Sequence, residues 1–329
     1  MMHAVQVHAP GGPEALQYER VARPELGAGE VLVQVHAIGL NPPDWYVREG
    51  MTVLPPEMRP VLKFPLILGS DISGVVEAVA DDVDQFVPGD EVFGMVRFPD
   101  EMADAYAEFV AAPATDLARK PAGIDHVHAA ASAMAGLTAW QFLIERGHDV
   151  VPPFQPELHH PVPLHAGTRV LVNGAAGGVG HIALQLAKWK GADVTAVASG
   201  SHGDFLRELG ADEVVDYTVA SPEGEYDLVL DSVGGPSTGR FLPLTKRGGA
   251  LFPVFFGPID PEQAAERDVY FSSTQVRANG AQLGELAELI DQGIVKIAID
   301  STFRLEDAVA AHERAAQGHI RGKIVLTVA

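Results

Sequence analysis

The chain has 329 residues, no cysteine, and 23 lysine and arginine residues against 44 aspartate and glutamate residues, which gives a formal charge of −21. Without thiols it forms no disulfide framework, cysteine-based zinc finger, iron–sulfur cluster or cysteine nucleophile. The acidic excess disfavours nucleic acid and membrane surfaces as partners. The length predicts two domains. Because no signal-like start or long apolar run occurs, we expect a cytoplasmic protein.

The first third of the chain has the pattern of an antiparallel β domain. Short runs rich in β-branched residues are separated by proline and glycine clusters, and Val31, Val33 and Val35 alternate within one run. The expected strands cover residues 4–8, 16–21, 30–39, 72–80, 91–94 and 106–111. Such punctuation favours a barrel or sandwich, which we expect to end near Pro121.

From about residue 125 the pattern changes to alternating helices and strands. An alanine-rich helix is expected over residues 126–146. The strands expected after it cover residues 169–173, 194–198, 213–215 and 226–231, with helices between the first three. This alternation predicts a parallel, doubly wound α/β sheet. Two more helices and a closing strand over residues 323–328 are expected near the C-terminus.

A glycine-rich loop lies between the expected strand 169–173 and the helix that follows it. Its residues are Ala175, Ala176, Gly177, Gly178, Val179 and Gly180. In this context the loop predicts a dinucleotide site, where Gly177 admits the pyrophosphate and Gly180 allows close packing of helix against strand. Ala175 replaces the first glycine of the usual fingerprint. The alternative is an ordinary tight turn.

The tip of the next strand indicates which dinucleotide is bound. No acidic residue follows strand 194–198, where one would bind the ribose of NAD. Donors suited to a 2′-phosphate stand there and at the following strand end: Ser199, Ser201, His202 and Tyr217. We therefore expect NADPH. Positive charge would have to come from Arg321 or Lys323, for which a solvated pair beside a strand is the alternative.

Taken in order, these motifs resemble the zinc-independent quinone oxidoreductase (zeta-crystallin-like) branch of the medium-chain dehydrogenase/reductase superfamily. The resemblance covers nearly the whole chain and rests on residues 41–48, 68–76, 88–90, 136–140, 175–180, 209–212 and 322–326. It implies a GroES-like, β-rich catalytic domain over residues 1–120, completed by about 280–329. It also implies a Rossmann domain over 121–279, with the active site in the cleft between the two.

The resemblance implies a chemistry without a metal. Zinc-dependent relatives carry a cysteine where this chain has Asn41 and a histidine where it has Ser70, and their zinc polarises a substrate oxygen. Without zinc a conjugated acceptor is favoured, because the charge left by hydride delocalises. We expect NADPH-dependent hydride transfer to a quinone. The alternatives are reduction of the C=C bond of an enone or enoyl thioester, as in a biosynthetic tailoring enzyme, and a non-catalytic NADPH-binding sensor or structural protein.

By the same resemblance, Asn41 and Tyr46 are the candidate catalytic donors near the nicotinamide and the acceptor. The family also implies cofactor contacts at Thr138, Ser232, Val233, Phe255, Phe256 and Gly257. The alternatives are a turn-shaping role for Asn41 and, for Tyr46, a half-buried aromatic whose hydroxyl reaches water. Asp44 and Arg48 are expected to form a surface or helix-start pair.

Two segments depart from the family pattern. Residues 250–255 are expected to form the outer strand that pairs with its copy in a homodimer, but Pro253 lacks the N–H needed for pairing. Residues 147–167 hold five prolines and four histidines where the family has a short connection. We expect a solvated surface loop there, with a lid over the cofactor as the alternative. A metal site is disfavoured because His159 and His160 are adjacent and tend to point apart.

Overall fold

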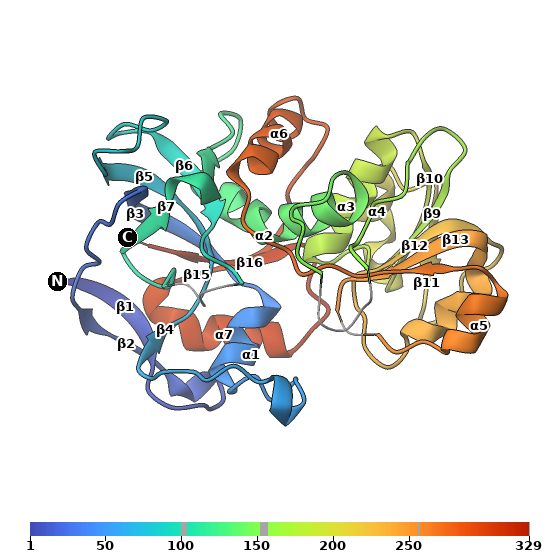
Figure 1. Cartoon of the computed structure of the whole chain (residues 1–329), viewed down its shortest axis with the longest axis horizontal. Coiled ribbons are helices and arrows are strands. Elements are labelled where there is room, and N and C mark those ends of the chain that lie inside the picture. Colours follow the sequence, from blue (N-terminus) through green and yellow to red (C-terminus); the bar gives the residue numbers. More distant parts are fainter. Residues whose placement is uncertain (100–103, 152–156, 256, 329) are drawn as a thin grey trace.

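The computed structural model describes residues 1–99, 104–151, 157–255 and 257–328. The chain forms two lobes side by side, and both ends of the chain lie on the first lobe (Figure 1). The strands of the first lobe are β1 (Met2–Val7), β2 (Leu16–Val21), β3 (Glu30–Gly39), β4 (Leu66–Ile67), β5 (Asp71–Val79), β6 (Glu91–Met95), β7 (Phe109–Pro113), β8 (Leu117–Arg119), β15 (Ile299–Arg304) and β16 (Lys323–Thr327). Those of the second lobe are β9 (Arg169–Asn173), β10 (Asp193–Ala198), β11 (Glu213–Asp216), β12 (Tyr226–Asp231), β13 (Thr245–Pro253) and β14 (Tyr270–Phe271). The helices are α1 (Pro42–Arg48), α2 (His126–Leu143), α3 (Gly178–Trp189), α4 (Gly203–Glu208), α5 (Pro261–Glu266), α6 (Gly280–Asp291) and α7 (Ala308–Ala316).

The first lobe is built from two sheets, and β3 lies in the larger one. One sheet has the order β15-β16-β3-β5-β6-β8, with β7 also paired to β3, and the other has the order β2-β1-β4. Val31, Val33 and Val35 of β3 are all buried, as their alternation predicts. Because β16 pairs antiparallel with β3, the C-terminal end of the chain completes the N-terminal sheet. We propose domain boundaries near residues 120 and 280 on this basis.

The second lobe is a parallel sheet in the order β11-β10-β9-β12-β13-β14, which confirms the predicted doubly wound α/β fold. The chain runs from β9 outward to β11, then returns to the other side of β9 and runs outward again from β12. The strand order therefore reverses beside β9. In open sheets of this type, ligands bind outside the carboxyl ends of the strands at such a switch point.

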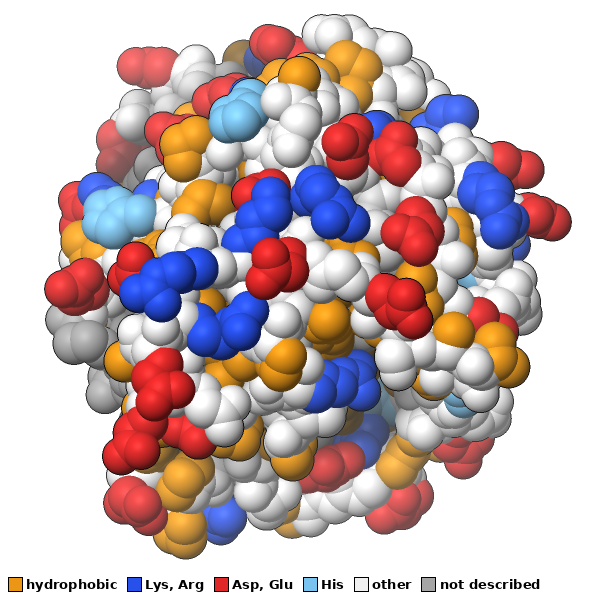
Figure 2. Space-filling view, turned by 90° about the vertical axis from the view of Figure 1, so that its right-hand side faces the viewer, with side chains coloured by type: hydrophobic (Ala, Val, Ile, Leu, Met, Phe, Trp, Pro, Cys, Tyr) orange, Lys and Arg blue, Asp and Glu red, His pale blue; other side chains and the backbone are white. Residues whose placement is uncertain are grey.

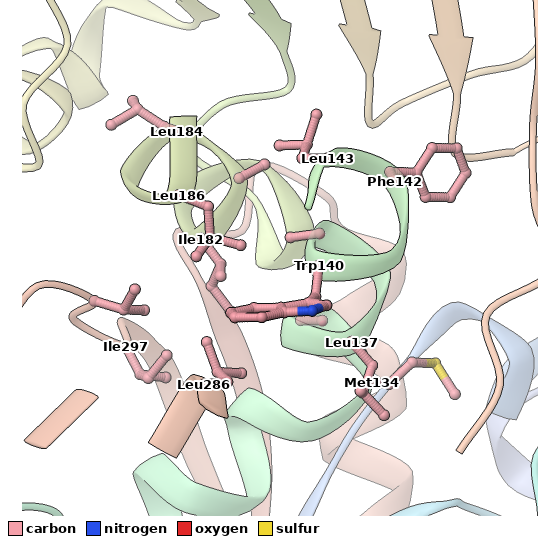
Figure 3. Packing of buried hydrophobic residues seen from close by; sticks show 14 of the residues in the cluster. Met134, Leu137, Trp140, Phe142, Leu143, Ile182, Leu184, Leu186, Leu286 and Ile297 are labelled. Carbon is pink, nitrogen blue, oxygen red and sulfur yellow. The ribbon is translucent and has the colours of Figure 1, made fainter. Parts of the chain in front are cut away.

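Helix α2 joins the two lobes. Asp125 caps it by accepting a hydrogen bond from the backbone N–H of His128 at 2.9 Å. Most of the helix is buried, and the Trp140 side chain lies among residues of α3 and α6, including Ile182 and Leu286 (Figure 3). One continuous apolar cluster thus spans the junction and contains residues of both lobes. This shared packing holds the two lobes in a fixed relative position.

The edge of the second sheet differs from the expectation for residues 250–255. Strand β13 ends at Pro253 and is covered on its outer side by β14, through the pairs Ala250 with Tyr270 and Leu251 with Phe271. The outermost strand in the described part of this sheet is therefore β14, which has two residues. Pro253 lies two residues beyond Leu251, the last β13 residue that is paired with β14, so β14 covers only part of the outer side of β13.

The distribution of charge on one face of the second lobe agrees with the acidic composition of the chain. On the outer end of the second lobe, basic side chains are interspersed with acidic ones and form no continuous basic surface (Figure 2). Across the described residues, the helices are too short or too polar to span a membrane.

Candidate active site

A cavity of about 440 Å³ lies between the lobes, where β9, β10 and β12 end. The predicted site residues that line it are Asn41, Ala176, Gly177, Gly178, Val179, Ser199, His202, Tyr217, Ser232, Val233 and Lys323. The predicted residues that lie outside its lining are Tyr46, Thr138, Ala175, Gly180, Ser201, Phe255, Gly257 and Arg321. Phe256 falls outside the described residues. The sequence reasoning missed further lining residues, among them Leu40, Trp45, Gly174, His319 and Ile320.

The glycine loop forms the second-lobe wall of the cavity. Gly174 leaves β9 at a φ of +71°, a conformation that favours glycine, so the chain turns at the residue directly before Ala175. Gly177 then precedes the first residue of α3. The first N–H groups of a helix have no partner within it, so a wall made of Gly177, Gly178 and Val179 suits a pyrophosphate.

Ala175 and Gly180 lie outside the cavity lining and support the glycine loop through packing. A Cβ atom at Gly180 would lie 2.2 Å from the Gly174 carbonyl oxygen and 2.8 Å from the Cα of Ala175. Glycine at this position therefore permits the close approach of α3 to the end of β9, as the sequence suggests. Ala175 is fully buried, and its N–H donates to the Val197 carbonyl at 3.1 Å.

A cluster of potential cations lies where β10 ends. The Ser199 and Ser201 hydroxyls are 3.1 Å apart, and burial, then the positive charges of Arg321 and His319, lower the pKa of His202. The Arg321 guanidinium lies 5.3 Å from the centre of the Phe205 ring on α4. This chain segment from the C-terminal end thus reaches the strand tip, and His319 is an addition that no local sequence motif indicated.

Helix α1 carries the opposite wall. Asp44 Oδ2 accepts hydrogen bonds from the Asn41 N–H at 2.9 Å and the Tyr106 hydroxyl at 3.0 Å. Arg48 donates to Nδ1 of His312 at 2.7 Å. Asp44 lies in the first turn of the helix and caps its start, and Arg48 is its last residue. Both are buried, so the surface part of the expected surface or helix-start pair is wrong. Tyr106 and His312 come from distant parts of the chain to contact them.

The Asn41 side chain is fully engaged. Its Nδ2 group donates to Asp71 Oδ2 at 2.8 Å and to the Gly39 carbonyl at 3.2 Å, while its Oδ1 atom accepts from the Lys323 ammonium. The reverse orientation would place the amide NH₂ against the ammonium and its oxygen against the carboxylate, so this one is favoured. An amide has two N–H hydrogens, and both are used. In this arrangement Asn41 has no hydrogen left for a substrate oxygen.

Lys323 lies in the same wall rather than at the strand tip. Its ammonium donates to the Leu40 carbonyl and to Asn41, and lies 3.9 Å from Asp71 Oδ2. Burial lowers the pKa of Lys323, while Asp71 and Asp44 act in the opposite direction. These bonds hold the ammonium beside Asn41, so it does not supply charge to a 2′-phosphate as the sequence reasoning expected.

The two buried acids of this wall resist ionisation. Burial raises the pKa of Asp44 to about 7, with the charge of Asp71 adding to the effect against the hydrogen bond from Asn41. Burial likewise raises the pKa of Asp71 to about 6, against the opposing influence of Lys323 and of the hydrogen bonds from Asn41 and Met134. The wall thus combines one ammonium with two carboxyl groups whose charge depends on pH.

The side chains in this wall do not fit a zinc ion. Asn41 Oδ1 is occupied by an ammonium, whose charge would repel a metal cation there. Ser70 is buried, and its hydroxyl is a poor zinc ligand. In the part of the chain that the structure describes, no group of three or more histidine, cysteine or acidic residues is placed to hold a metal ion. Chemistry at this wall therefore depends on hydrogen-bond donors.

Tyr46 and Phe255 form a contact between the lobes. Their ring centres are 5.6 Å apart and tilted by 36°. Tyr46 is half-buried, and desolvation, followed by the charge of Glu49, raises the pKa of its hydroxyl.

Two other predicted cofactor residues have packing roles within the protein. Thr138 is buried and donates its hydroxyl hydrogen to the Met134 carbonyl at 2.7 Å. A Cβ at Gly257 would meet Thr238 Oγ1 at 2.2 Å, which indicates a packing reason for that glycine.

The proline-rich segment is more firmly attached than a solvated loop. His159 is buried, with Nε2 3.1 Å from the Phe142 carbonyl and Nδ1 3.1 Å from the Ser272 hydroxyl. The His160 N–H donates to the Tyr270 hydroxyl at 3.0 Å. His159 thus points inward and the expectation of full solvation is wrong for it. Pro152, Pro153 and Pro156 lie outside the described residues.

Comparisons with known proteins agree with this architecture. The family described as "Alcohol dehydrogenase GroES-like domain" matches residues 27–122, and "Zinc-binding dehydrogenase" matches residues 209–326. Mouse mitochondrial NAD(P)H oxidoreductase RTN4IP1 is 33% identical over 91% of this chain and 82% of its own length. The chloroplast envelope quinone oxidoreductase homolog of Arabidopsis thaliana is 32% identical over 99% and 98%.

Solved structures give the same result. The quinone oxidoreductase from Coxiella burnetii superposes with a TM-score of 0.85 at 32% identity, covering 100% of this chain and 99% of that one. Escherichia coli quinone oxidoreductase complexed with NADPH superposes with a TM-score of 0.82 at 25% identity, covering 99% of each. The chain therefore belongs to the quinone oxidoreductase branch of the medium-chain dehydrogenase/reductase superfamily.

Proposed function

We propose that the protein transfers hydride from NADPH to a quinone without using zinc. The observation that carries this proposal is the two-sided cavity, in which a glycine loop at the start of α3 faces the buried polar side chains of Asn41 and Lys323 from the first lobe. The first side suits a dinucleotide, and the second offers donors but no metal-binding set among the described residues. Relatives named quinone oxidoreductase, including one complexed with NADPH, support the same activity.

Purified protein is expected to consume NADPH when a quinone is added, followed by the loss of nicotinamide absorbance. A parallel panel of enones tests the alternative chemistry, and reactions without an acceptor give the background. Consumption with enones alone would replace the quinone with a C=C bond as the acceptor. An increase of NADPH fluorescence on binding, with no oxidation in either panel, would instead support the non-catalytic alternative.

For the 2′-phosphate we propose Arg321 as the positive charge, with His202, His319, Ser199, Ser201 and Tyr217 as further donors. The Arg321→Ala variant is expected to raise the Kd for NADPH about tenfold, equivalent to ~1.4 kcal/mol, because one charged contact to the phosphate is lost. The Kd for NADH, which lacks that phosphate, should stay unchanged. Both constants are measured by fluorescence titration.

Arg207→Ala is the matched control for this variant. Arg207 is an exposed arginine on the neighbouring helix α4, and it is paired with Asp204 at 3.1 Å. It should affect neither nucleotide. A similar loss of NADH and NADPH affinity in Arg321→Ala would show that Arg321 acts elsewhere on the dinucleotide or on the fold.

A homodimer and a cytoplasmic location remain our proposals for the assembly and the compartment. The dimer is supported by the family resemblance alone, and β14 pairs with Ala250 and Leu251 on the outer side of β13. Relatives carry mitochondrial or chloroplast names, so location varies within the family. The expected partner is a small conjugated carbonyl compound or quinone.

A further inference from the structure

The reaction proposed above requires a donor for the acceptor's oxygen, and hydrogen-bond counting distinguishes Asn41 from Lys323 as that donor. Tyr46, the other candidate donor, lies outside the lining of the cavity. Charge develops on this oxygen when hydride arrives, and a donor placed there stabilises it. Both Asn41 Nδ2 hydrogens already bind Asp71 and Gly39. Releasing one would leave a buried acceptor without its partner, which is unfavourable.

Lys323 has the donor capacity that Asn41 lacks. An ammonium carries three N–H hydrogens, and two of those on Lys323 bind the Leu40 carbonyl and Asn41 Oδ1. Asp71 Oδ2, at 3.9 Å from Nζ, is within ion-pair range but beyond a hydrogen bond. The third hydrogen therefore has no acceptor at bonding distance among the described residues, and Lys323 lines the cavity.

The glycine loop makes room for this side chain. A Cβ atom at Gly178 would lie 2.9 Å from Cδ of Lys323. The backbone around Lys323 is tied to the same loop, because the Gly322 N–H donates to the Ala176 carbonyl at 2.8 Å. The lysine stem thus runs from the dinucleotide wall to Asn41 and brings its ammonium to the junction between the expected cofactor and acceptor sites.

We propose that Lys323 is a catalytic residue, whose ammonium donates its third hydrogen to the oxygen of the bound acceptor and releases that proton on reduction. The inference rests on the proposed function. The quinone gains a hydride and becomes a hydroquinone anion, while NADPH is oxidised to NADP⁺. The Nζ–H bond of Lys323 then breaks and an O–H bond forms on the anion. A proton taken up from the solvent restores the ammonium, so the net reaction consumes NADPH, one proton and the quinone and yields NADP⁺ and the hydroquinone.

The surroundings suit such an exchange. Burial favours the neutral amine and lowers the pKa of Lys323, which eases proton release, while Asp71 on β5 and Asp44 on α1 favour the ammonium. His181 on α3 also faces this group; its pKa is lowered to about 4, chiefly by burial, so it adds no positive charge near neutral pH. Burial and the two carboxyl groups therefore act in opposite directions on the pKa of Lys323, and burial dominates.

The test compares Lys323→Met with Lys120→Met. Lys120 is an equally buried lysine of the first lobe, with 6% of its side chain exposed against 5% for Lys323, and it binds the carbonyls of Pro121 and Ile124 away from the cavity. Lys323→Met is expected to lower kcat with a quinone about 100-fold, as for loss of one oxyanion donor. The NADPH Kd should change less than threefold, about the range of a minor contact.

A second measurement does not depend on turnover. We expect 4-nitrophenolate, a stable phenolate, to bind the NADP⁺-saturated protein about tenfold more weakly in Lys323→Met than in wild type or Lys120→Met. The Lys323→Arg variant keeps a cationic donor and should recover a substantial part of both properties. Thermal unfolding shows whether each variant is folded. If Lys323→Met does not fold, the comparison of Lys323→Arg with wild type still tests the proposal.

Two results would overturn the assignment. A tenfold or larger rise of the NADPH Kd with kcat retained at saturating NADPH would place Lys323 on the cofactor's phosphates. Unchanged phenolate binding would show that its third hydrogen does not reach the acceptor site. If wild-type protein reduces neither quinones nor enones, the proposed function fails, yet the phenolate comparison still decides whether Lys323 binds an oxyanion.

Discussion

Replacing Asp231 with alanine is expected to lower the free energy of unfolding by about 4 kcal/mol, because a buried acceptor of four hydrogen bonds is removed. Asp231 is 1% exposed at the end of β12. Its carboxylate accepts from Asn173 Nδ2 and Thr238 Oγ1, each at 2.7 Å, and from the N–H groups of Val233 at 3.2 Å and Gly234 at 3.0 Å. The alanine variant leaves all four donors without this acceptor inside the second lobe.

Asp227→Ala is the control, because Asp227 lies near the other end of the same strand. It accepts from the Arg169 N–H and the Lys246 ammonium, but 37% of its side chain is exposed and water can replace both bonds. The expected loss is at most about 1 kcal/mol. Urea unfolding followed by tryptophan fluorescence measures both variants. Equal losses would contradict the argument that burial of Asp231 determines its importance.

Asp231 also connects stability with the site. Its oxygens hold the turn that carries Val233, a residue of the cavity wall, against Asn173 at the end of β9. In the Asp231→Ala variant this turn loses its fixed position. We therefore expect weaker NADPH binding under conditions where the variant is still folded.

The second lobe was predictable because its signals are local. Strand, glycine loop and helix follow one another within about twenty residues, and the parallel sheet follows from their repetition. Even so, Gly174 was not singled out from the sequence. The fingerprint begins at Ala175, whereas the positive φ belongs to Gly174, directly before it. A glycine adjacent to a motif carries the same sequence signal as one inside it, and only backbone geometry distinguishes them.

The wall around Lys323 was not predictable, because its members are far apart in the chain. Lys323 and Asn41 are separated by 282 positions, and Arg48 and His312 by 264. Sequence spacing indicates neighbours along a helix, so Asp44 and Arg48 read as an exposed pair. Their burial depends on groups that the fold brings from elsewhere. The same reason explains why the sequence did not indicate that Lys323 lies beside Asn41.

Acidification from about pH 6.5 to pH 4 is expected to remove a stabilising contribution of His181 on the order of 3 kcal/mol. Burial lowers the pKa of His181 from 6.5 to about 4. Its Nδ1 lies 2.8 Å from the Gly177 carbonyl and donates to it, while Nε2 accepts from the Ala298 N–H at 3.2 Å. A proton on Nε2 would face that N–H and break the second bond.

The direction of this pH effect on stability depends on whether the folded or the unfolded chain binds more protons. Between pH 4 and 6.5 the unfolded chain protonates this histidine and the folded chain does not, so stability rises with pH across that window and is lost on acidification. His159, with its pKa lowered to about 4, and His312, lowered to about 3, act in the same direction, each mainly because of burial. The structural role of these three residues therefore requires the neutral imidazole.

Asp44 and Asp71 oppose this trend, which is why the measurement needs a variant. Their pKa values are raised to about 7 and about 6, so the folded chain binds protons before the unfolded chain does, and their contribution to stability falls as pH rises through 4 to 7. The wild-type curve of stability against pH therefore reports the difference between the contribution of the histidines and that of the two aspartates.

The variant His181→Asn isolates the contribution of one histidine. Its amide can still donate to Gly177, and it should be less stable than wild type at pH 7.5 and should lose less stability on acidification. His8→Asn, at an exposed position, should follow the wild-type curve. Parallel curves for His181→Asn and wild type would show that His181 is protonated equally in both states.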